Sequence, residues 1–228
     1  MGALRSIKGF ALRYGPRAGR RKALALLLGG LLLMAGAVTP LAGEPARLVA
    51  LGDSLVHGYG LPPADGFVPQ LEAWLQAQGA DVVVANAGVS GDTTAGGRAR
   101  LDWALGDAEA DGLIVVLGGN DLLRGIDPAV SRENMDALVA AARAKGLSVL
   151  LGGMRAPGNY GAAYKSDFDA IYPDVAEAHG ALLYPEFLAG VTEDPSLWQA
   201  DGLHPNAAGV ARIVEGIGPL VLSLLDPD

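Results

Sequence analysis

The chain has 228 residues, half of them apolar, which is enough for one full α/β domain and short for two. It has no cysteine, which excludes disulfide bonds, a thiolate metal site, a cysteine nucleophile and a lipid-anchored N-terminal cysteine. Residues 1–43 carry seven basic and no acidic residues, and the rest carries 10 basic against 25 acidic residues; the net charge of −15 on that part argues against a nucleic-acid partner.

The first 43 residues have the pattern of an export signal. A run of basic residues precedes an apolar segment over 23–38, shorter than the ~20 residues needed to cross a bilayer. Ala35 and Ala37 then form an A-x-A-like cleavage site. We expect a signal peptide over 1–43 and a folded domain over 44–228, with an uncleaved membrane anchor as the alternative.

Apolar segments that fit buried strands alternate with segments whose apolar residues recur at helical spacing. In chain order the predicted elements are strand 47–51, helix 65–78, strand 81–85, helix 93–105, strand 112–117, a helix capped by Asp127 and ended by Gly146, strand 147–151, a helix around 168–175 that Pro173 kinks or breaks, strand 181–184 and helix 206–225. This alternation predicts a parallel sheet between helical layers, a three-layer α/β/α domain without an internal linker.

Four polar, glycine-rich segments are predicted to meet at one edge of this sheet. Ligands of open α/β sheets gather at the carboxyl ends of the strands. The first strand is followed by residues 52–54, the second by 86–94 and the third by 118–121. The last loop before the final helix carries Asp201 and His204.

Ser54 is the candidate nucleophile. A serine hydroxyl is a weak nucleophile that needs an adjacent base, a group that orients the base, and donors for the oxyanion formed on attack. Ser54 lies two residues after Gly52 at a strand end, where the backbone can turn sharply and leave the hydroxyl exposed. The alternative is that Asp53 or Ser54 only caps a helix.

Three histidines are candidates for the base. Asp201 lies three residues before His204, and a tight turn would let its carboxylate reach one ring nitrogen. His57 has no acid nearby to orient it, and His179 lies at a predicted helix C-terminus, where a cation suits the helix dipole. We expect His204 as base and Asp201 as its orienter; the alternative is an Asx-turn with a surface histidine.

Two further positions can supply oxyanion donors. Asn120 follows a glycine pair at the end of a buried strand and offers a side-chain amide, unless it is only a turn residue in left-handed geometry. Gly91, in Ser90-Gly91-Asp92-Thr93, offers a backbone N–H at a helix start. Each of these residue patterns is weak evidence alone. Their placement together, after the first three strands and in the last loop, supports the hypothesis of a serine hydrolase site.

These residues resemble the SGNH (GDSL-type) hydrolases, in the branch that holds periplasmic thioesterase/lysophospholipase and bacterial arylesterase. The matching blocks are ALGDSL at 50–55, NAGVSGDTTAGG at 86–97, VLGGNDLLRG at 116–125 and DGLHPNAAG at 201–209. The resemblance implies a flavodoxin-like sheet of five parallel strands, with neither metal nor cofactor. It implies a periplasmic or secreted enzyme that acts on a small-molecule acyl ester or thioester and has no stable membrane partner unless the leader is retained.

The resemblance also implies a role for each matching residue. Ser54 would be the nucleophile and its N–H an oxyanion donor, with Gly91 N–H and the Asn120 amide as the others. His204 would be the base and Asp201 its orienter. The segment 154–164 resembles a loop that closes over the acyl group, with Gly158 where a bulkier residue is expected. Its expected substrate-binding residues are Met154, Arg155, Ala156, Pro157 and Tyr160.

The function expected from these residues is hydrolysis of acyl esters through a Ser-His-Asp triad and an acyl-enzyme, with aryl esters, acyl thioesters and lysophospholipids as candidate substrates. A carbohydrate deacetylase would use the same machinery on another acyl acceptor. A binding module of the same fold would not need all five positions. A metal-dependent hydrolase is less well supported, because no HExxH pattern or paired histidine is present.

Export is expected to remove the leader and leave a mature N-terminus between Val38 and Arg47, from the cleavage-site pattern and the break in charge. Intact-mass measurement of the protein from the periplasm checks this. A mass corresponding to all 228 residues, recovered with the membrane fraction, would instead identify an anchor.

Overall fold

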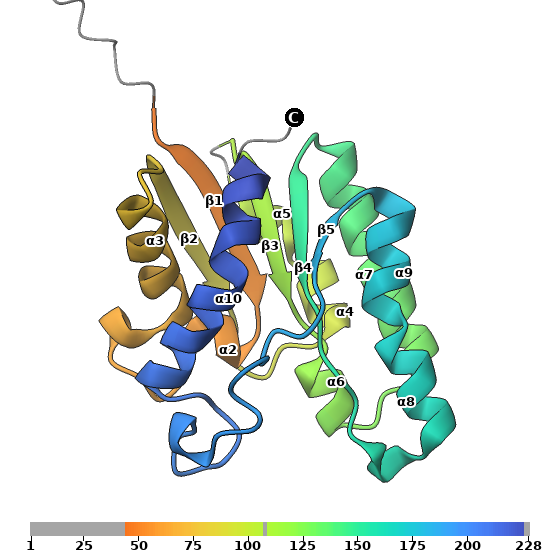
Figure 1. The fold of residues 1–228 in the computed structure, drawn as a ribbon. Coiled ribbons are helices and arrows are strands. Elements are labelled where there is room, and N and C mark those ends of the chain that lie inside the picture. Colours follow the sequence, from red (N-terminus) through yellow and green to blue (C-terminus); the bar gives the residue numbers. More distant parts are fainter. Residues whose placement is uncertain (1–43, 107–108, 226–228) are drawn as a thin grey trace, which may run out of the picture. The chain divides into compact units, whose positions relative to one another are not determined.

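The computed structural model describes residues 44–106 and 109–225, so the predicted signal peptide lies outside the described residues. A parallel sheet of five strands runs through the domain, in the order β2-β1-β3-β4-β5 (Figure 1). The strands are β1 Ala46–Gly52, β2 Val82–Gly88, β3 Gly112–Val116, β4 Ser148–Gly152 and β5 Leu182–Tyr184. This is the flavodoxin-like order, so the predicted fold class is confirmed.

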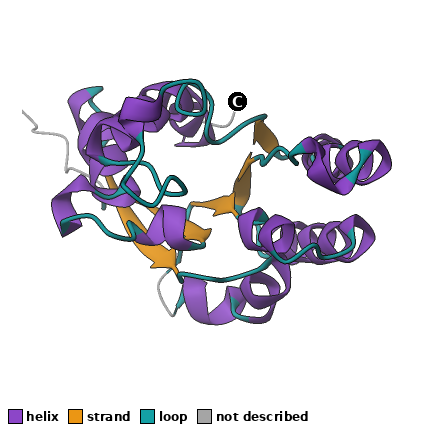
Figure 2. Cartoon of the chain, turned by 90° about the horizontal axis from the view of Figure 1, so that it is seen from below, coloured by secondary structure: helices purple, strands orange, loops and turns teal. Residues whose placement is uncertain are grey.

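Helices cover both faces of the sheet, as Figure 2 shows edge-on. On one side α3 (Phe67–Ala77) packs with α10 (Ala207–Leu225). On the other side α7 (Pro128–Ala144) packs with α4 (Thr94–Ala99) and α9 (Ile171–His179). The remaining helices are α2 Ser54–His57, α5 Leu101–Leu105, α6 Gly119–Leu123, α8 Ala162–Asp169 and the short 3₁₀ turns η1 Pro63–Asp65, η2 Gly158–Tyr160 and η3 Pro195–Leu197.

The central strands are apolar because both of their faces are covered. Residues 48–51 of β1 and 113–117 in and after β3 are fully buried. Helix α10 is, among the described residues, the one helix long and apolar enough to cross a membrane by length and composition. It packs against α3, β4 and β5, and its inward residues from Val210 to Leu224 belong to the core, as in a core helix of a globular domain.

Two predicted helices differ in detail from the structure. The helix expected over 93–105 is divided into α4 and α5 at Arg100, whose φ of −109° and ψ of 13° leave the helical region. The helix expected around 168–175 is broken, as its proline indicated: α8 ends at Asp169, and Pro173 lies in the first turn of α9. The short helix α6 was not predicted, because one turn of helix has no recognisable period, and α2 was considered only as the helix that Asp53 or Ser54 would cap.

The register of the sheet places the ends of β1, β2 and β3 side by side, so the loops that follow these three strands begin next to one another. Gly52, the last residue of β1, pairs with Gly88 at the end of β2 and with Val116 at the end of β3. Helix α2 then lies close against the end of β2: a Cβ on Gly88 would stand 2.2 Å from His57 N. The Asn86 side chain fixes this contact, donating from Nδ2 to Val56 O and accepting from Gly88 N–H. Only glycine at 88 allows this approach.

Gly88→Ala should therefore destabilise the domain by about 1 to 3 kcal/mol, the usual cost of overpacking, and lower the melting temperature by several degrees. Gly158→Ala is the control, because a Cβ there meets nothing within 4 Å. Thermal unfolding followed by circular dichroism measures both. Equal melting temperatures for the two variants would show that α2 shifts without cost.

Candidate active site

Ser54, His204 and Asp201 form a chain of hydrogen bonds at the carboxyl edge of the sheet. His204 Nδ1 lies 2.7 Å from Asp201 Oδ2, and His204 Nε2 lies 2.9 Å from Ser54 Oγ. Because an ionised carboxylate only accepts, the ring proton belongs on Nδ1. Nε2 is then free to accept the hydroxyl proton of Ser54. The structure thus places the predicted nucleophile, base and orienter in the expected contact.

The loop from Asp201 to His204 is shaped by the carboxylate that also contacts the ring. Asp201 Oδ1 accepts the N–H groups of Leu203 and His204, and Gly202 takes a φ of 64°. The Asx-turn considered as the alternative is therefore present, and it is what aims the second carboxylate oxygen at the ring. Hydrogen bonds from the His204 ring and from these two N–H groups lower the pKa of Asp201 to about 2, so it stays ionised at neutral pH.

The far side of the imidazole is held by a neighbouring loop. The ring of Tyr59 lies against that of His204, with centroids 4.7 Å apart. Gln199 joins the two loops: its Nε2 donates to Tyr59 O and Pro205 O, and its backbone N–H donates to His204 O. Neither Tyr59 nor Gln199 was identified from the sequence, because neither belongs to a residue type that marks a reaction.

The other two histidines have different surroundings. His57 is exposed, and its Nδ1 lies 3.3 Å from Gly88 O; among the described residues it forms no ion pair with a carboxylate. His179 ends α9, where its Nε2 lies 2.8 Å from Asp136 Oδ1 on α7. Neither ring lies among the residues that line the cavity beside Ser54.

The expected oxyanion donors, Ser54, Gly91 and Asn120, line the same cavity. Within the described part of the chain, the N–H groups of Ser54 and Gly91 donate to no protein acceptor, so both are available to a bound oxygen. Gly91 has a φ of 82°, a conformation that favours glycine, and its carbonyl accepts a hydrogen bond of 2.7 Å from Arg124. Asn120, in the first turn of α6, directs its Nδ2 toward Asp53.

Arg100 binds the strand ends beneath these donors. Its guanidinium donates to Gly52 O at 2.9 Å, to Ala87 O at 2.7 Å and to Asp92 Oδ2 at 2.7 Å. The Arg100 side chain is only 17% exposed and that of Asp92 only 12%, so the contacts are shielded from water. One side chain thus links β1, β2 and the loop that carries Gly91.

Asp53 is a site residue that sequence reasoning treated only as a helix cap. The residue is 2% exposed; Oδ1 accepts from Leu55 N–H at 3.0 Å, and Oδ2 accepts from Asn120 Nδ2 at 3.1 Å. Burial, partly opposed by these two hydrogen bonds, raises the pKa of Asp53 to about 6. The available signal was an acid beside the candidate nucleophile at the end of a buried strand.

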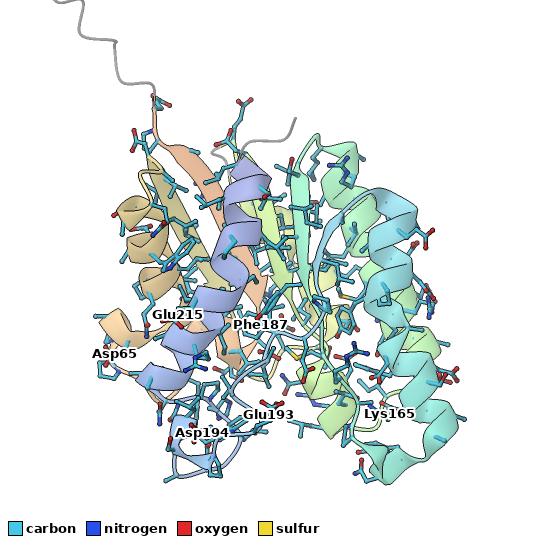
Figure 3. The ribbon with its side chains drawn as sticks, viewed as in Figure 1. Asp65, Lys165, Phe187, Glu193, Asp194 and Glu215 are labelled. Carbon is cyan, nitrogen blue, oxygen red and sulfur yellow. The ribbon has the colours of Figure 1, made fainter. Side chains whose placement is uncertain are left out.

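One cavity of about 460 Å³ is lined by Asp53, Ser54, Tyr59, Gly91, Asn120 and His204. Met154, Arg155, Pro157 and Tyr160 line it as well, whereas Ala156, the fifth predicted substrate-binding residue, does not. Ala156 is buried and anchors the loop instead: its N–H donates to Asp169 and its carbonyl accepts from Lys165. Lys165, labelled in Figure 3, lies on α8 beside this loop.

The free energy of unfolding of Asp53→Asn should increase relative to that of the parent protein as the pH rises. The native state binds the Asp53 proton more tightly than the unfolded chain, whose ordinary value is 3.8, so this residue favours the folded state below pH 4 and loses that effect as the pH passes about 6. Between pH 4 and pH 7 the variant should gain on the order of 2 to 3 kcal/mol over the parent. Urea unfolding of both proteins at the two pH values tests this, and a difference independent of pH would contradict a raised pKa.

Comparison with known proteins identifies the family of this chain. The model of the GDSL-like lipase/acylhydrolase family matches residues 50–212. Esterase TesA of Pseudomonas aeruginosa is 39% identical over 201 residues, which cover 88% of this chain and 99% of that protein. Thioesterase 1/protease 1/lysophospholipase L1 of Escherichia coli strain K12 is 34% identical over 181 residues, covering 79% and 86%.

Two solved structures of esterases also resemble this chain. A crystal structure of TesA matches with a TM-score of 0.74 and 40% identity, over 78% of this chain and 99% of its own. The esterase AlinE4, described as an SGNH-hydrolase family esterase, matches with a TM-score of 0.68 and 43% identity, over 80% of this chain and 98% of its own. The chain therefore belongs to the GDSL-like lipase/acylhydrolase family, as its four sequence blocks predicted.

Proposed function

We propose that this chain is a serine esterase that hydrolyses acyl esters through an acyl-enzyme on Ser54. The observation that carries the proposal is the continuous chain of hydrogen bonds from Asp201 through His204 to Ser54, at the wall of a cavity large enough for a small acyl ester. Membership of an acylhydrolase family and relatives named as esterases support the same reaction class.

In the proposed mechanism Ser54 Oγ attacks the ester carbonyl while His204 Nε2 takes its proton. The oxyanion that forms is stabilised by the N–H groups of Ser54 and Gly91 and by the Asn120 amide. His204 then gives the proton to the leaving alcohol or thiol, and the acyl group stays on Ser54. Water repeats the cycle and releases the acid. Asp201, ionised throughout, keeps the imidazole in the tautomer that accepts at Nε2.

The cavity supports an apolar acyl group. Leu122, Leu123, Met154, Pro157 and Tyr160 line it on the side of α6 and the 153–160 loop. Tyr59 and Leu203 line it beside His204, and both are about half exposed, so the mouth is apolar as well. Aryl esters, acyl thioesters and lysophospholipids, each of which carries an apolar acyl group on a reactive carbonyl, are the proposed substrates.

We place the enzyme outside the cytoplasm, in the periplasm or secreted. The observations in support are the basic, then apolar, then small-residue pattern of residues 1–43 and the acidic domain that follows it. The proposed partner is the small-molecule substrate alone.

Replacement of the two histidines nearest Ser54 tests the assignment of the base. His204→Ala should lower kcat on p-nitrophenyl esters by on the order of 10⁴-fold or more, because the three residues act as a unit. His57→Ala is the matched control: it should retain most activity, with at most ~10-fold loss if the ring helps to position α2. Circular dichroism verifies that both variants are folded.

Labelling by a fluorophosphonate probe completes the test. The parent should be labelled at Ser54 and Ser54→Ala should not, because the probe reacts with an activated serine. A parent protein that stays unlabelled and turns over no ester would be a binding module. Loss of turnover in His57→Ala with retention in His204→Ala would refute the proposed base.

A further inference from the structure

Asp53 is a buried carboxylate that the proposed mechanism does not use. It is 2% exposed, directly precedes Ser54, and has a hydrogen bond at each oxygen. A buried carboxylate costs free energy unless its partners compensate, and burial raises the pKa of Asp53 to about 6. At neutral pH the Asp53 carboxylate is therefore ionised, although its buried surroundings disfavour the charge. Such an arrangement calls for a function beyond capping a helix of four residues.

The partner of Asp53 is an amide that can face two ways. The side chain of Asn120 has an NH₂ donor and a carbonyl acceptor of nearly equal size, and rotation by half a turn exchanges them. Only the NH₂ group can stabilise an oxyanion, whereas the carbonyl would repel it. An ionised carboxylate has no hydrogen to donate, so Asp53 Oδ2 pairs with Nδ2 and excludes the rotated form.

The backbone of Asn120 is held by a separate set of contacts. The neighbouring Asp121 is buried and accepts from Thr94 N–H and Oγ on α4 and from Ser131 Oγ on α7. These hydrogen bonds fix where α6 begins, whatever residue stands at 53. What remains for Asp53 to determine is the orientation of the Asn120 side chain.

We propose that Asp53 is a positioning residue that orients the Asn120 amide, keeping its NH₂ group toward the oxyanion. One hydrogen of Nδ2 is bound to Asp53, and the second is left for the substrate oxygen. The proposal rests on the proposed role of Asn120 in ester hydrolysis. The acid of the Gly-Asp-Ser turn then acts on the reaction through Asn120, without touching the substrate.

Asp53→Asn separates this role from helix capping. An asparagine at 53 can still accept Leu55 N–H through its carbonyl, so the cap is kept. Its NH₂ group would then face Nδ2 of Asn120, and Asn120 would rotate to present its carbonyl to both the new donor and the oxyanion. We expect kcat to fall by about 10²-fold to 10³-fold, the usual cost of one oxyanion donor, with little change in KM.

A double-mutant cycle provides the decisive readout. Asn120→Ala should cost a similar factor in kcat, and adding Asp53→Asn to it should cost nothing more, since the orienter has lost the group that it orients. Asp127→Asn is the matched control: Asp127 caps α7 through a hydrogen bond to Ala129 N–H, far from Ser54 in sequence and outside the cavity lining. It should leave kcat unchanged.

The outcomes distinguish the two proposals. If Asn120→Ala keeps full kcat, the oxyanion role of Asn120 fails, and the positioning role fails with it. If Asn120→Ala is impaired but Asp53→Asn is not, or if the two losses multiply, Asp53 is only a cap or a structural residue. Should Asp53→Asn not fold, Asp53→Ser enters the same cycle, because serine also caps helices and cannot hold Nδ2 at this distance.

Discussion

The guanidinium of Arg100 is the interaction on which the arrangement of the site depends. Where a strand ends, its last carbonyls leave the hydrogen-bond ladder of the sheet, and buried carbonyls need donors. Arg100 donates to Gly52 O, which also accepts from Val89 N–H, and to Ala87 O near the end of β2, and it binds Asp92 in the next loop. A planar group with five donors in fixed directions suits this task, and lysine could not replace it. This anchor joins the end of the strand that leads to Ser54 with the loop that carries Gly91.

Two aspartates in the site are perturbed in opposite directions, and the difference comes from their surroundings. Asp201 lies near the surface and accepts from two backbone N–H groups and an imidazole, which together favour its charge. Asp53 is buried, and two hydrogen bonds do not fully offset the loss of water. The first carboxylate is stabilised by its own loop. The second depends on the surrounding fold, and its charge weakens that fold at neutral pH.

The sequence predicted the strands and the meeting of four loops because both follow from patterns of residue type. Apolar runs closed by glycine predicted β1 and β3, and the rule for carboxyl ends brought Ser54, Asn120 and His204 together. The division of the helix at Arg100 was missed, because it depends on contacts with strand ends far away in the chain.

The contacts of Asp53 and Tyr59 were missed for a different reason. An aspartate before a serine is typical of a helix cap, and here it is one, so the pattern gave no reason to look further. The tyrosine lies in a glycine-rich turn, and its contact with the His204 ring comes from the way in which Gln199 joins two loops. Local pattern identifies the residues that react, whereas tertiary contacts decide which neighbours hold them.

Helix α10 has a consequence for the route by which the chain would leave the cell. Before folding, its 19 residues, with a mean hydropathy of 1.6, resemble a segment that partitions into lipid. A chain threaded through a translocation channel could be arrested there. Arg212 and Glu215 oppose this, since a charge near the centre of such a segment adds about 2.5 to 3.5 kcal/mol to the free energy of insertion. On the folded protein the two side chains are exposed, where replacement costs little, so passage through the channel would constrain them more strongly than stability does.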